Sequence, residues 1–182
     1  MRPLLFTILA VSLIIIPNSV MAEDEFLSSV KGEVEDIHMT SVQADLVVVE
    51  KSARRLTLFV DRNPMRTYKI ALGRNPIGAK YKQGDLRTPE GFYTIDGRNP
   101  KSQFHRSLHI SYPNERDLEI ARLLKVPTGN DIVIHGVSED YEWMGKYHAA
   151  LNWTDGCIAV TNEEIEEIWD LVPDGTEVHI KP

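Results

Sequence analysis

Residues 46–72 read LVVVEKSARRLTLFVDRNPMRTYKIAL, and this stretch predicts three short β-strands in succession. Residues 46–49 are β-branched and apolar, and residues 55–60 alternate between polar and apolar side chains, which is the period of a half-buried strand. Residues 61–64 supply turn residues before the alternation resumes over residues 65–72. The domain is therefore expected to open as a meander of strands.

The same pattern continues on the far side of a long loop at residues 73–91, which carries too many glycines and prolines for a helix. Further short apolar runs predict strands at residues 91–95, 107–112, 131–136, 158–160 and 176–180.

Two segments have helical periodicity instead. Asn114 can cap a helix over residues 115–125. Thr161 and Glu164 form a capping box for a second helix that ends before Pro173. The predicted buried stripes are Leu118, Ala121 and Leu124 in the first helix, and Ile165, Ile168, Trp169 and Val172 in the second. Many short strands with two short helices predict a mainly β fold (α+β), a sandwich or barrel with helices at its edge.

Residues 1–22 have the three-part layout of a secretory signal peptide. Arg2 precedes an apolar run at residues 4–16, which is shorter than the ~20 residues that a membrane-spanning helix needs, and the segment ends in small residues at Ala22. Cleavage after Ala22 is expected, with an uncleaved anchor as the alternative. Residues 23–44 then form a polar, acidic linker, and residues 45–182 form one exported domain.

Composition excludes several classes of protein. Asp+Glu 27 against Lys+Arg 20 argues against a nucleic-acid partner, and a single cysteine cannot form an internal disulfide or a cysteine-rich zinc module. In an oxidising compartment an unpaired thiol is buried and inert, paired between chains, or retained for chemistry. The surroundings of Cys157 must therefore decide its role.

The residues that carry chemistry gather in two segments. Residues 131–136 (DIVIHG) predict a strand that ends on His135, and residues 153–160 (WTDGCIAV) place Cys157 after Gly156. A thiol becomes a strong nucleophile when an imidazole takes its proton and a third group holds that imidazole in one tautomer. Gly156 lets the backbone turn its N–H groups toward an oxyanion. Taken alone the pair is a weak signal, because a histidine at a strand end is more often structural.

These residues make the chain resemble the L,D-transpeptidase catalytic domain, or YkuD domain, over residues 45–182. The family pattern is His-Gly, a spacer, and Ser/Thr-His-Gly-Cys. The matches are Ile-His-Gly at residues 134–136, Thr154, Gly156, Cys157 and Ile158, and upstream Thr-Pro-Glu-Gly-Phe at residues 88–92 with Gly73. Two positions depart from the pattern: Asp155 replaces the second histidine, and Ala159 replaces the usual Arg or Asn.

The resemblance implies an L,D-transpeptidase-type sandwich or barrel and an exported cysteine transpeptidase that acts on peptidoglycan stem peptides of the meso-diaminopimelate type. Cys157 would attack the carbonyl of the third residue and expel the terminal D-alanine, and His135, oriented by the carbonyl of Gly136, would move the protons. The N–H groups of Gly156 and Cys157 would stabilise the oxyanion. The acyl group would pass to an amine of a second stem peptide or of an attached wall protein, in cell wall cross-linking or remodelling.

The resemblance further implies no cofactor and no metal, a monomer, and a location in the bacterial periplasm or cell envelope, where the substrate lies. Three alternatives remain open. A hydrolase (an L,D-carboxypeptidase or amidase-like enzyme) would use the same site with water. A metal site would draw on His135, His148, Asp155 and Cys157, although their spacing matches no short ligand motif. A non-catalytic wall-binding module would bury the cysteine.

The sequence predicts the substrate-binding residues less directly than the candidate catalytic residues. The candidates are Trp153, Thr154, Asp155, His148 and Arg106, with Arg74 and Arg98 as further cations for substrate carboxylates. His148 either fills the place of the missing family histidine or is an ordinary loop residue. Residues 138–152 form either a lid with exposed aromatics or a loop that packs back on the domain. Asp155 would disfavour a free thiolate but favour a thiolate–imidazolium pair, and the sequence leaves both outcomes open.

Overall fold

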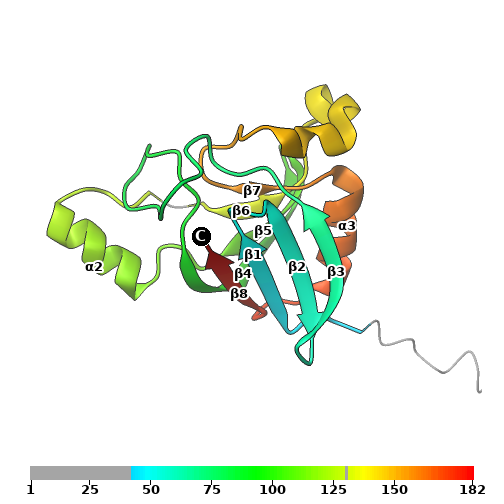
Figure 1. Cartoon of the computed structure of the whole chain (residues 1–182), viewed down its shortest axis with the longest axis horizontal. Coiled ribbons are helices and arrows are strands. Elements are labelled where there is room, and N and C mark those ends of the chain that lie inside the picture. Colours follow the sequence, from blue (N-terminus) through cyan, green and yellow to red (C-terminus); the bar gives the residue numbers. More distant parts are fainter. Residues whose placement is uncertain (1–41, 130) are drawn as a thin grey trace, which may run out of the picture. The chain divides into compact units, whose positions relative to one another are not determined.

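Eight strands form one mixed sheet in the computed structural model of the chain, which describes residues 42–129 and 131–182 (Figure 1). The order across the sheet is β3-β2-β1-β8-β4-β5-β6-β7. The strands are β1 (Leu46–Glu50), β2 (Arg55–Val60), β3 (Asn63–Lys69), β4 (Gly91–Ser102), β5 (His105–Ile110), β6 (Val133–His135), β7 (Ile158–Ala159) and β8 (Glu177–Lys181). The predicted mainly β fold with short helices is confirmed.

The meander predicted from residues 46–72 is present, with one boundary shifted. β1 pairs antiparallel with β2, and β2 with β3. Only Asp61 and Arg62 form the turn between β2 and β3, and both have positive φ (48° and 67°), as tight hairpin turns require. Asn63 and Pro64 therefore belong to β3, where proline is tolerated because this strand is at the end of the sheet order.

The last strand lies in the middle of the sheet. β8 pairs parallel with β1, with Leu46 opposite Glu177, and antiparallel with β4, with Gly91 opposite Ile180. The N-terminal meander is thus joined to the second half of the sheet by a strand more than 100 residues away in the sequence.

The two ends of the sheet order meet, which makes the sheet barrel-like. Ala71, just after β3, exchanges two backbone hydrogen bonds of 2.9 Å with Ala159 of β7. Next to them, Thr154 N–H donates to Leu72 O (3.2 Å) and Arg74 N–H donates to Thr154 O (3.0 Å). This closure brings the glycine-rich loop that follows β3 against the turn that contains Cys157.

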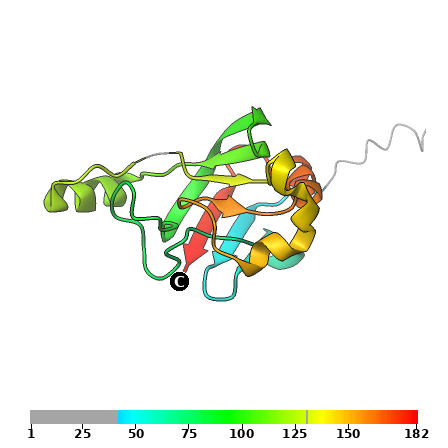
Figure 2. The ribbon, with the colours of Figure 1, turned by 90° about the horizontal axis from the view of Figure 1, so that it is seen from above.

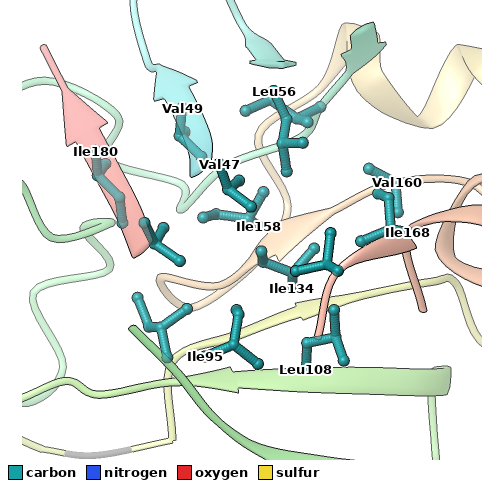
Figure 3. Close-up of a cluster of buried hydrophobic side chains, with 14 of the residues drawn as sticks. Val47, Val49, Leu56, Ile95, Leu108, Ile134, Ile158, Val160, Ile168 and Ile180 are labelled. Carbon is teal, nitrogen blue, oxygen red and sulfur yellow. The ribbon is translucent and has the colours of Figure 1, made fainter. Parts of the chain in front are cut away.

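The core fills the interior between the sheet halves (Figure 3). Its fully buried members come from both halves and from α3 (Asn162–Leu171), and include Val47, Val49, Leu56, Ile95, Leu108, Ile134, Ile158, Ile165, Ile168 and Ile180. The capping box predicted for α3 is present: Glu164 N–H donates to Thr161 Oγ1 (3.2 Å), and Thr161 N–H donates to Glu164 Oε2 (3.0 Å).

The other predicted helix, α2 (Glu115–Leu124), forms but packs differently from expectation. Asn114 caps it, and Ala121 is buried, yet Leu118 and Leu124 are more than half exposed. Figures 1 and 2 show the reason, since α2 projects away from the sheet and has no layer against one side. The prediction of a buried stripe was therefore wrong for these two leucines.

Residues 139–150, expected as a lid or loop, form the 3₁₀ segment η1 (Glu139–Ala150), which is kinked at Gly145 (φ 46°). Ala44 is buried and donates its N–H to Leu171 O (2.7 Å), so packing begins near the predicted domain start. The predicted signal peptide and almost all of the linker lie outside the described residues. Within residues 42–129 and 131–182, no helix is long and apolar enough to cross a membrane.

Candidate active site

Two adjacent parallel strands bring His135 and Cys157 to one face of the sheet. β6 pairs with β7 in the register Ile134 opposite Ile158 and His135 opposite Ala159. Ile134 and Ile158 face the core, so His135 and Cys157, each one residue away, face the other side. The two Cα atoms are then two register steps apart, roughly 8 Å from strand geometry. The side chains can therefore meet above the sheet.

His135 is held in one tautomer. Its side chain is buried, and Nδ1 lies 2.6 Å from the carbonyl oxygen of Gly136. A carbonyl only accepts hydrogen bonds, so Nδ1 carries the proton and Nε2 has a free lone pair. Phe104 stacks on the imidazole at 4.5 Å between ring centroids, and Trp153 meets it edge-on at 5.7 Å. The predicted orienting contact from Gly136 is therefore in the structure, and Phe104 was missed.

Burial sets the charge state of this imidazole. Removal from water lowers the pKa of His135 to about 4; the Gly136 carbonyl opposes the shift, and His148 adds slightly to it. His135 is therefore neutral at pH 7, which is the form that a general base needs.

Asn162 supports the same peptide unit from its other side. Its Oδ1 accepts the N–H of Val137 (2.8 Å), and that N–H belongs to the peptide bond whose carbonyl accepts from His135. A Cβ at Gly136 would come within 2.4 Å of this Oδ1, so glycine is needed for the approach. Sequence reasoning missed Asn162, although its position directly after the cap Thr161 was a usable signal.

The turn before Cys157 is organised by a buried hydroxyl. Thr154 Oγ1 donates to the carbonyl of Cys157 (2.8 Å) and accepts the N–H of Gly156 (3.2 Å). Gly156 has φ 137°, and a Cβ there would lie 2.6 Å from Arg87 O. Thr154 therefore shapes the turn, and the N–H of Gly156, expected at the oxyanion, donates to Thr154.

The thiol of Cys157 is neutral at rest. Burial raises its pKa above the ordinary value, the charge of Asp155 adds to this, and the N–H of Val133 and the charge of Lys80 oppose it. Because the pKa of His135 is lowered at the same time, a neutral thiol and neutral imidazole are favoured over an ion pair. Both shifts favour the first of the two outcomes that the sequence left open, in which the free thiolate is disfavoured.

The predicted cations lie in different places. Arg74 forms an exposed ion pair with Asp155, and Asp155 lines the same cavity as Cys157. Arg106 pairs with Glu166 (3.0 Å) and lies over the ring of Trp169, both on α3. Arg98 pairs with Asp174 (2.6 Å) and also donates to carbonyls at the end of α3. Arg98 and Arg106 therefore bind groups on α3 and just after it. This corrects the expectation that they bind substrate carboxylates in the cleft.

Two cavities flank the site. The one beside Cys157 has about 290 Å³ and a mixed lining, which includes the polar or charged Lys80, Gln83, Asp131, Asp155 and Cys157 and the apolar Leu86 and Ile132. The other has about 400 Å³ and lies under η1, lined by Val137, Tyr141, Met144, His148, Leu151 and Trp153. His148 and Trp153 thus line the second cavity, and the ring of Trp153 contacts both His135 and His148. Trp143 and Tyr147 of η1 point into solvent.

Metal-ligating side chains do not gather at this site. Among residues 42–129 and 131–182, no three His, Cys, Asp or Glu side chains are grouped so that they could hold a metal ion.

The fold and the His–Gly and Gly–Cys segments define a class of catalytic domain. The family model described as "L,D-transpeptidase catalytic domain" (YkuD) matches residues 44–180, and the chain belongs to this family.

Two curated relatives carry the L,D-transpeptidase name as a provisional assignment. YafK of Escherichia coli (strain K12) is 28% identical over 132 residues, covering 69% of this chain and 46% of YafK. YqjB of Bacillus subtilis (strain 168) is 29% identical over 140 residues, covering 74% of this chain and 69% of YqjB. The chain thus spans about half the length of YafK.

Solved structures give the same fold. The helical cell shape determining protein Pgp2 from Campylobacter jejuni superposes with a TM-score of 0.58 at 25% identity, covering 87% of this chain and 55% of Pgp2. Bd1075 of Bdellovibrio bacteriovorus superposes with a TM-score of 0.55 at 23% identity, covering 79% of this chain and 50% of Bd1075, and shows the fold alone.

Proposed function

We propose that this chain is an exported cysteine L,D-transpeptidase that acts on peptidoglycan stem peptides, with Cys157 as nucleophile and His135 as general base. One observation carries the proposal: a buried, neutral His135, fixed through Nδ1 by Gly136, lies on the strand beside the cysteine in a fold of the L,D-transpeptidase family. The register of β6 and β7 places His135 and Cys157 on the same face of the sheet, and the thiol of Cys157 donates to the carbonyl of Asp131 (3.5 Å).

In the first half-reaction, Cys157 Sγ attacks the carbonyl of the third stem residue while its proton passes to Nε2 of His135. The oxyanion is stabilised by the backbone N–H of Cys157, because the N–H of Gly156 is bonded to Thr154. The tetrahedral intermediate collapses when the leaving D-alanine nitrogen takes the proton from His135. A thioester and neutral His135 remain.

In the second half-reaction, an amine attacks the thioester and gives a proton to Nε2 of His135. The thiolate leaves and regains its proton from His135, so the enzyme returns to its neutral resting state. The acceptor is an amine of a second stem peptide or of an attached wall protein, and no cofactor takes part. Water as acceptor would make the same site a hydrolase.

The proposed setting is the periplasm or cell envelope of a bacterium, with the chain acting as a monomer. The layout of residues 1–22 supports export, and the role of Pgp2 as a helical cell shape determining protein supports cell wall remodelling as the outcome. The donor peptide is placed in the 290 Å³ cavity, where Asp155 and Cys157 are both lining residues.

The test is intact mass spectrometry of the protein after incubation with a stem tetrapeptide or a carbapenem. A covalent adduct is expected with the native chain and not with Cys157→Ala. Chromatography of muropeptide products then separates the outcomes, since cross-linked dimers indicate transfer and shortened monomers alone indicate hydrolysis. An adduct that survives in Cys157→Ala, or turnover that is unchanged in that variant, would refute the proposed nucleophile.

A further inference from the structure

The cavity beside Cys157 contains charges of both signs. Asp131 and Asp155 contribute carboxylates, and Lys80 is the one basic side chain among the described residues that line it. Asp155 is already paired with Arg74 outside the cavity lining. Lys80 is therefore the cation that a ligand entering this cavity would meet.

The ammonium of Lys80 is buried but incompletely bonded. Its side chain is 4% exposed, and Nζ donates to Asp85 Oδ1 (2.9 Å) and to the carbonyl of Lys82 (3.1 Å). An ammonium has three N–H groups, so one of them has no acceptor among the residues that the structure describes. Leaving such a donor unpaired in a buried site costs free energy, which an acceptor in the cavity would recover.

Asp85 does not depend on Lys80 alone. Its two oxygens also accept the backbone N–H groups of Tyr81 (2.9 Å), Lys82 (3.1 Å) and Arg87 (3.2 Å). Burial by itself would raise the pKa of Asp85, but the hydrogen bonds from Lys80 and from these three N–H groups outweigh it, so the pKa is lowered. If the Lys80 charge were removed, these three backbone N–H groups would still donate to Asp85. Their hydrogen bonds would continue to hold the loop in its present shape.

A second buried lysine, Lys51 in the turn after β1, contacts the same loop and shows what a purely structural role looks like. Lys51 Nζ donates to Gly78 O (2.7 Å), Thr88 O (2.9 Å) and Glu90 Oε1 (2.7 Å), which are three acceptors for three N–H groups. Its side chain is 2% exposed, and it is not among the residues that line the cavity. Lys80 therefore differs from Lys51 in two respects: it lines the cavity, and it has one N–H group without an acceptor among the described residues.

We propose that Lys80 is the carboxylate-binding residue of the donor site, and that its ammonium binds the C-terminal carboxylate of the stem tetrapeptide whose peptide bond Cys157 attacks. The proposal rests on the proposed function and names the group by which that substrate is recognised. A charge-assisted hydrogen bond from a buried ammonium to a carboxylate is among the stronger polar contacts in proteins.

The position of Lys80 fits one residue beyond the scissile bond. Lys80 and Cys157 line the same 290 Å³ cavity, so a carbonyl at Sγ places the next residue of the peptide in that cavity. Consecutive Cα atoms are about 3.8 Å apart, so the terminal carboxylate of a tetrapeptide lies within one residue length of the reacting carbonyl. A longer stem would present an uncharged peptide group to Lys80 instead. The contact therefore selects stems that end one residue past the attacked carbonyl.

The test pairs two substrates with three variants. The substrates are the stem tetrapeptide L-Ala-γ-D-Glu-meso-diaminopimelate-D-Ala and its C-terminal amide, and kcat/KM is measured for the native chain, Lys80→Met, Lys51→Met and Arg74→Met. The native chain is expected to prefer the acid by about 30-fold or more, and Lys80→Met is expected to reduce this preference to less than about 3-fold, mainly through KM. Lys51→Met and Arg74→Met should keep the native ratio.

The double variant Lys80→Met/Asp85→Asn guards against misfolding, because it removes both buried charges and keeps the side-chain shapes. If Lys80→Met does not fold by circular dichroism, the ratio is read from the double variant. A folded Lys80 variant that keeps the native ratio overturns the proposal, as does loss of the ratio in Arg74→Met. A tetrapeptide with lysine in place of diaminopimelate separates the two carboxylates, and Lys80→Met should lower kcat/KM for this peptide as much as for the diaminopimelate peptide. If Lys80→Met lowers kcat/KM only for the diaminopimelate peptide, the bound carboxylate is that of diaminopimelate and the proposal is wrong.

A binding measurement distinguishes failure of the proposed function from failure of the Lys80 inference. If the native chain turns over neither substrate, calorimetry with Cys157→Ala decides the inference: tighter binding of the acid than of the amide, lost in Cys157→Ala/Lys80→Met, supports Lys80. Equal or no binding of the two peptides by Cys157→Ala overturns it.

Discussion

His135 and His148 are buried to the same extent, each with 1% of its surface exposed, yet only His135 has a hydrogen-bond partner among the described residues. His135 has a hydrogen-bond partner for Nδ1 and lies on the strand next to Cys157, whereas both ring nitrogens of His148 lack partners among the described residues. Burial lowers the pKa of both. The difference shows that burial makes an imidazole neutral, and that a fixed acceptor on one nitrogen is what makes the other a directed base.

The largest expected effect comes from truncating each histidine in turn. His135→Ala should slow formation of the acyl-enzyme by about 10³–10⁴-fold, because the proton acceptor is removed, whereas His148→Ala should change it by less than about 10-fold. The measurement is the rate of adduct formation with a stem tetrapeptide, followed by intact mass. Equal losses in the two variants would abolish the distinction between the two residues.

The next effect is on pH dependence. The unfolded chain binds a proton at His135 near pH 6.5 and the folded chain only near pH 4, so the contribution of His135 to stability is complete above pH 6.5 and is lost as pH falls toward 4. The loss is on the order of 3 kcal/mol. Urea unfolding of the native chain at pH 7 and pH 4 should show it, and His135→Gln should show a smaller fall. The acid limb of kcat/KM should likewise lie near pH 4; an acid limb at pH 6 to 7 would contradict a buried neutral base.

Substitution of Asn162 should have a smaller effect on stability and acylation. Asn162 holds the peptide unit that orients His135. Asn162→Ala leaves the buried N–H of Val137 without its acceptor, so we expect a loss of about 1–3 kcal/mol in stability and roughly 10-fold slower acylation. Asn162→Asp keeps an acceptor and adds negative charge, so it should restore stability and raise the pKa of His135, moving the acid limb upward.

Thr161→Ala is the matched control for Asn162. It removes the adjacent helix cap at a comparable cost of about 1 kcal/mol, but it leaves the bond to Val137 in place. A shift of the acid limb in Thr161→Ala equal to that in Asn162→Asp would show that α3 acts only through general stability.

The smallest effect should be on His148 itself. His148→Phe removes two buried nitrogens that have no partner in the described structure and places an aromatic ring against the apolar cavity under η1. We expect unfolding free energy to be unchanged or to rise by up to about 1 kcal/mol, with activity within a few-fold of native. A large loss of activity with intact folding would instead make His148 part of the substrate site.

Local sequence patterns predicted most of the elements but not all of their limits. The capping box at Thr161 and the alternation in residues 55–60 were sufficient for α3 and β2, because both signals are local. β4 runs to Ser102 rather than Ile95, since its pairing with β5 continues across irregular register that no local pattern indicates. The prediction that Leu118 and Leu124 of α2 are buried was wrong. Periodicity shows which side chains share one face of a helix, but it does not show whether another element packs against that face.

For the candidate site, the residues with reactive side chains could be proposed from the sequence, but the residues that support them could not. His135, Gly136, Gly156 and Cys157 were recognised because each carries a chemical or conformational requirement of its own. Asn162, Phe104 and Lys80 belong to no local sequence motif. Their importance comes from what their side chains reach in the folded chain: the N–H of Val137, the ring of His135 and the cavity beside Cys157. Arg106 was misplaced for the same reason, since α3 supplies the carboxylate of Glu166 that holds it.

The sequence by itself determined the mainly β character of this chain and the start of α3, and it supplied His135 and Cys157 as the candidate pair. The tertiary structure alone decided that β8 enters the middle of the sheet, that Ala71 meets Ala159, and that Lys80 faces the cavity of Cys157. The physical reason is distance along the chain. Periodicity and capping depend on neighbours within a few residues, whereas strand order, closure and cavity lining depend on contacts whose free energy appears only when remote segments pack together.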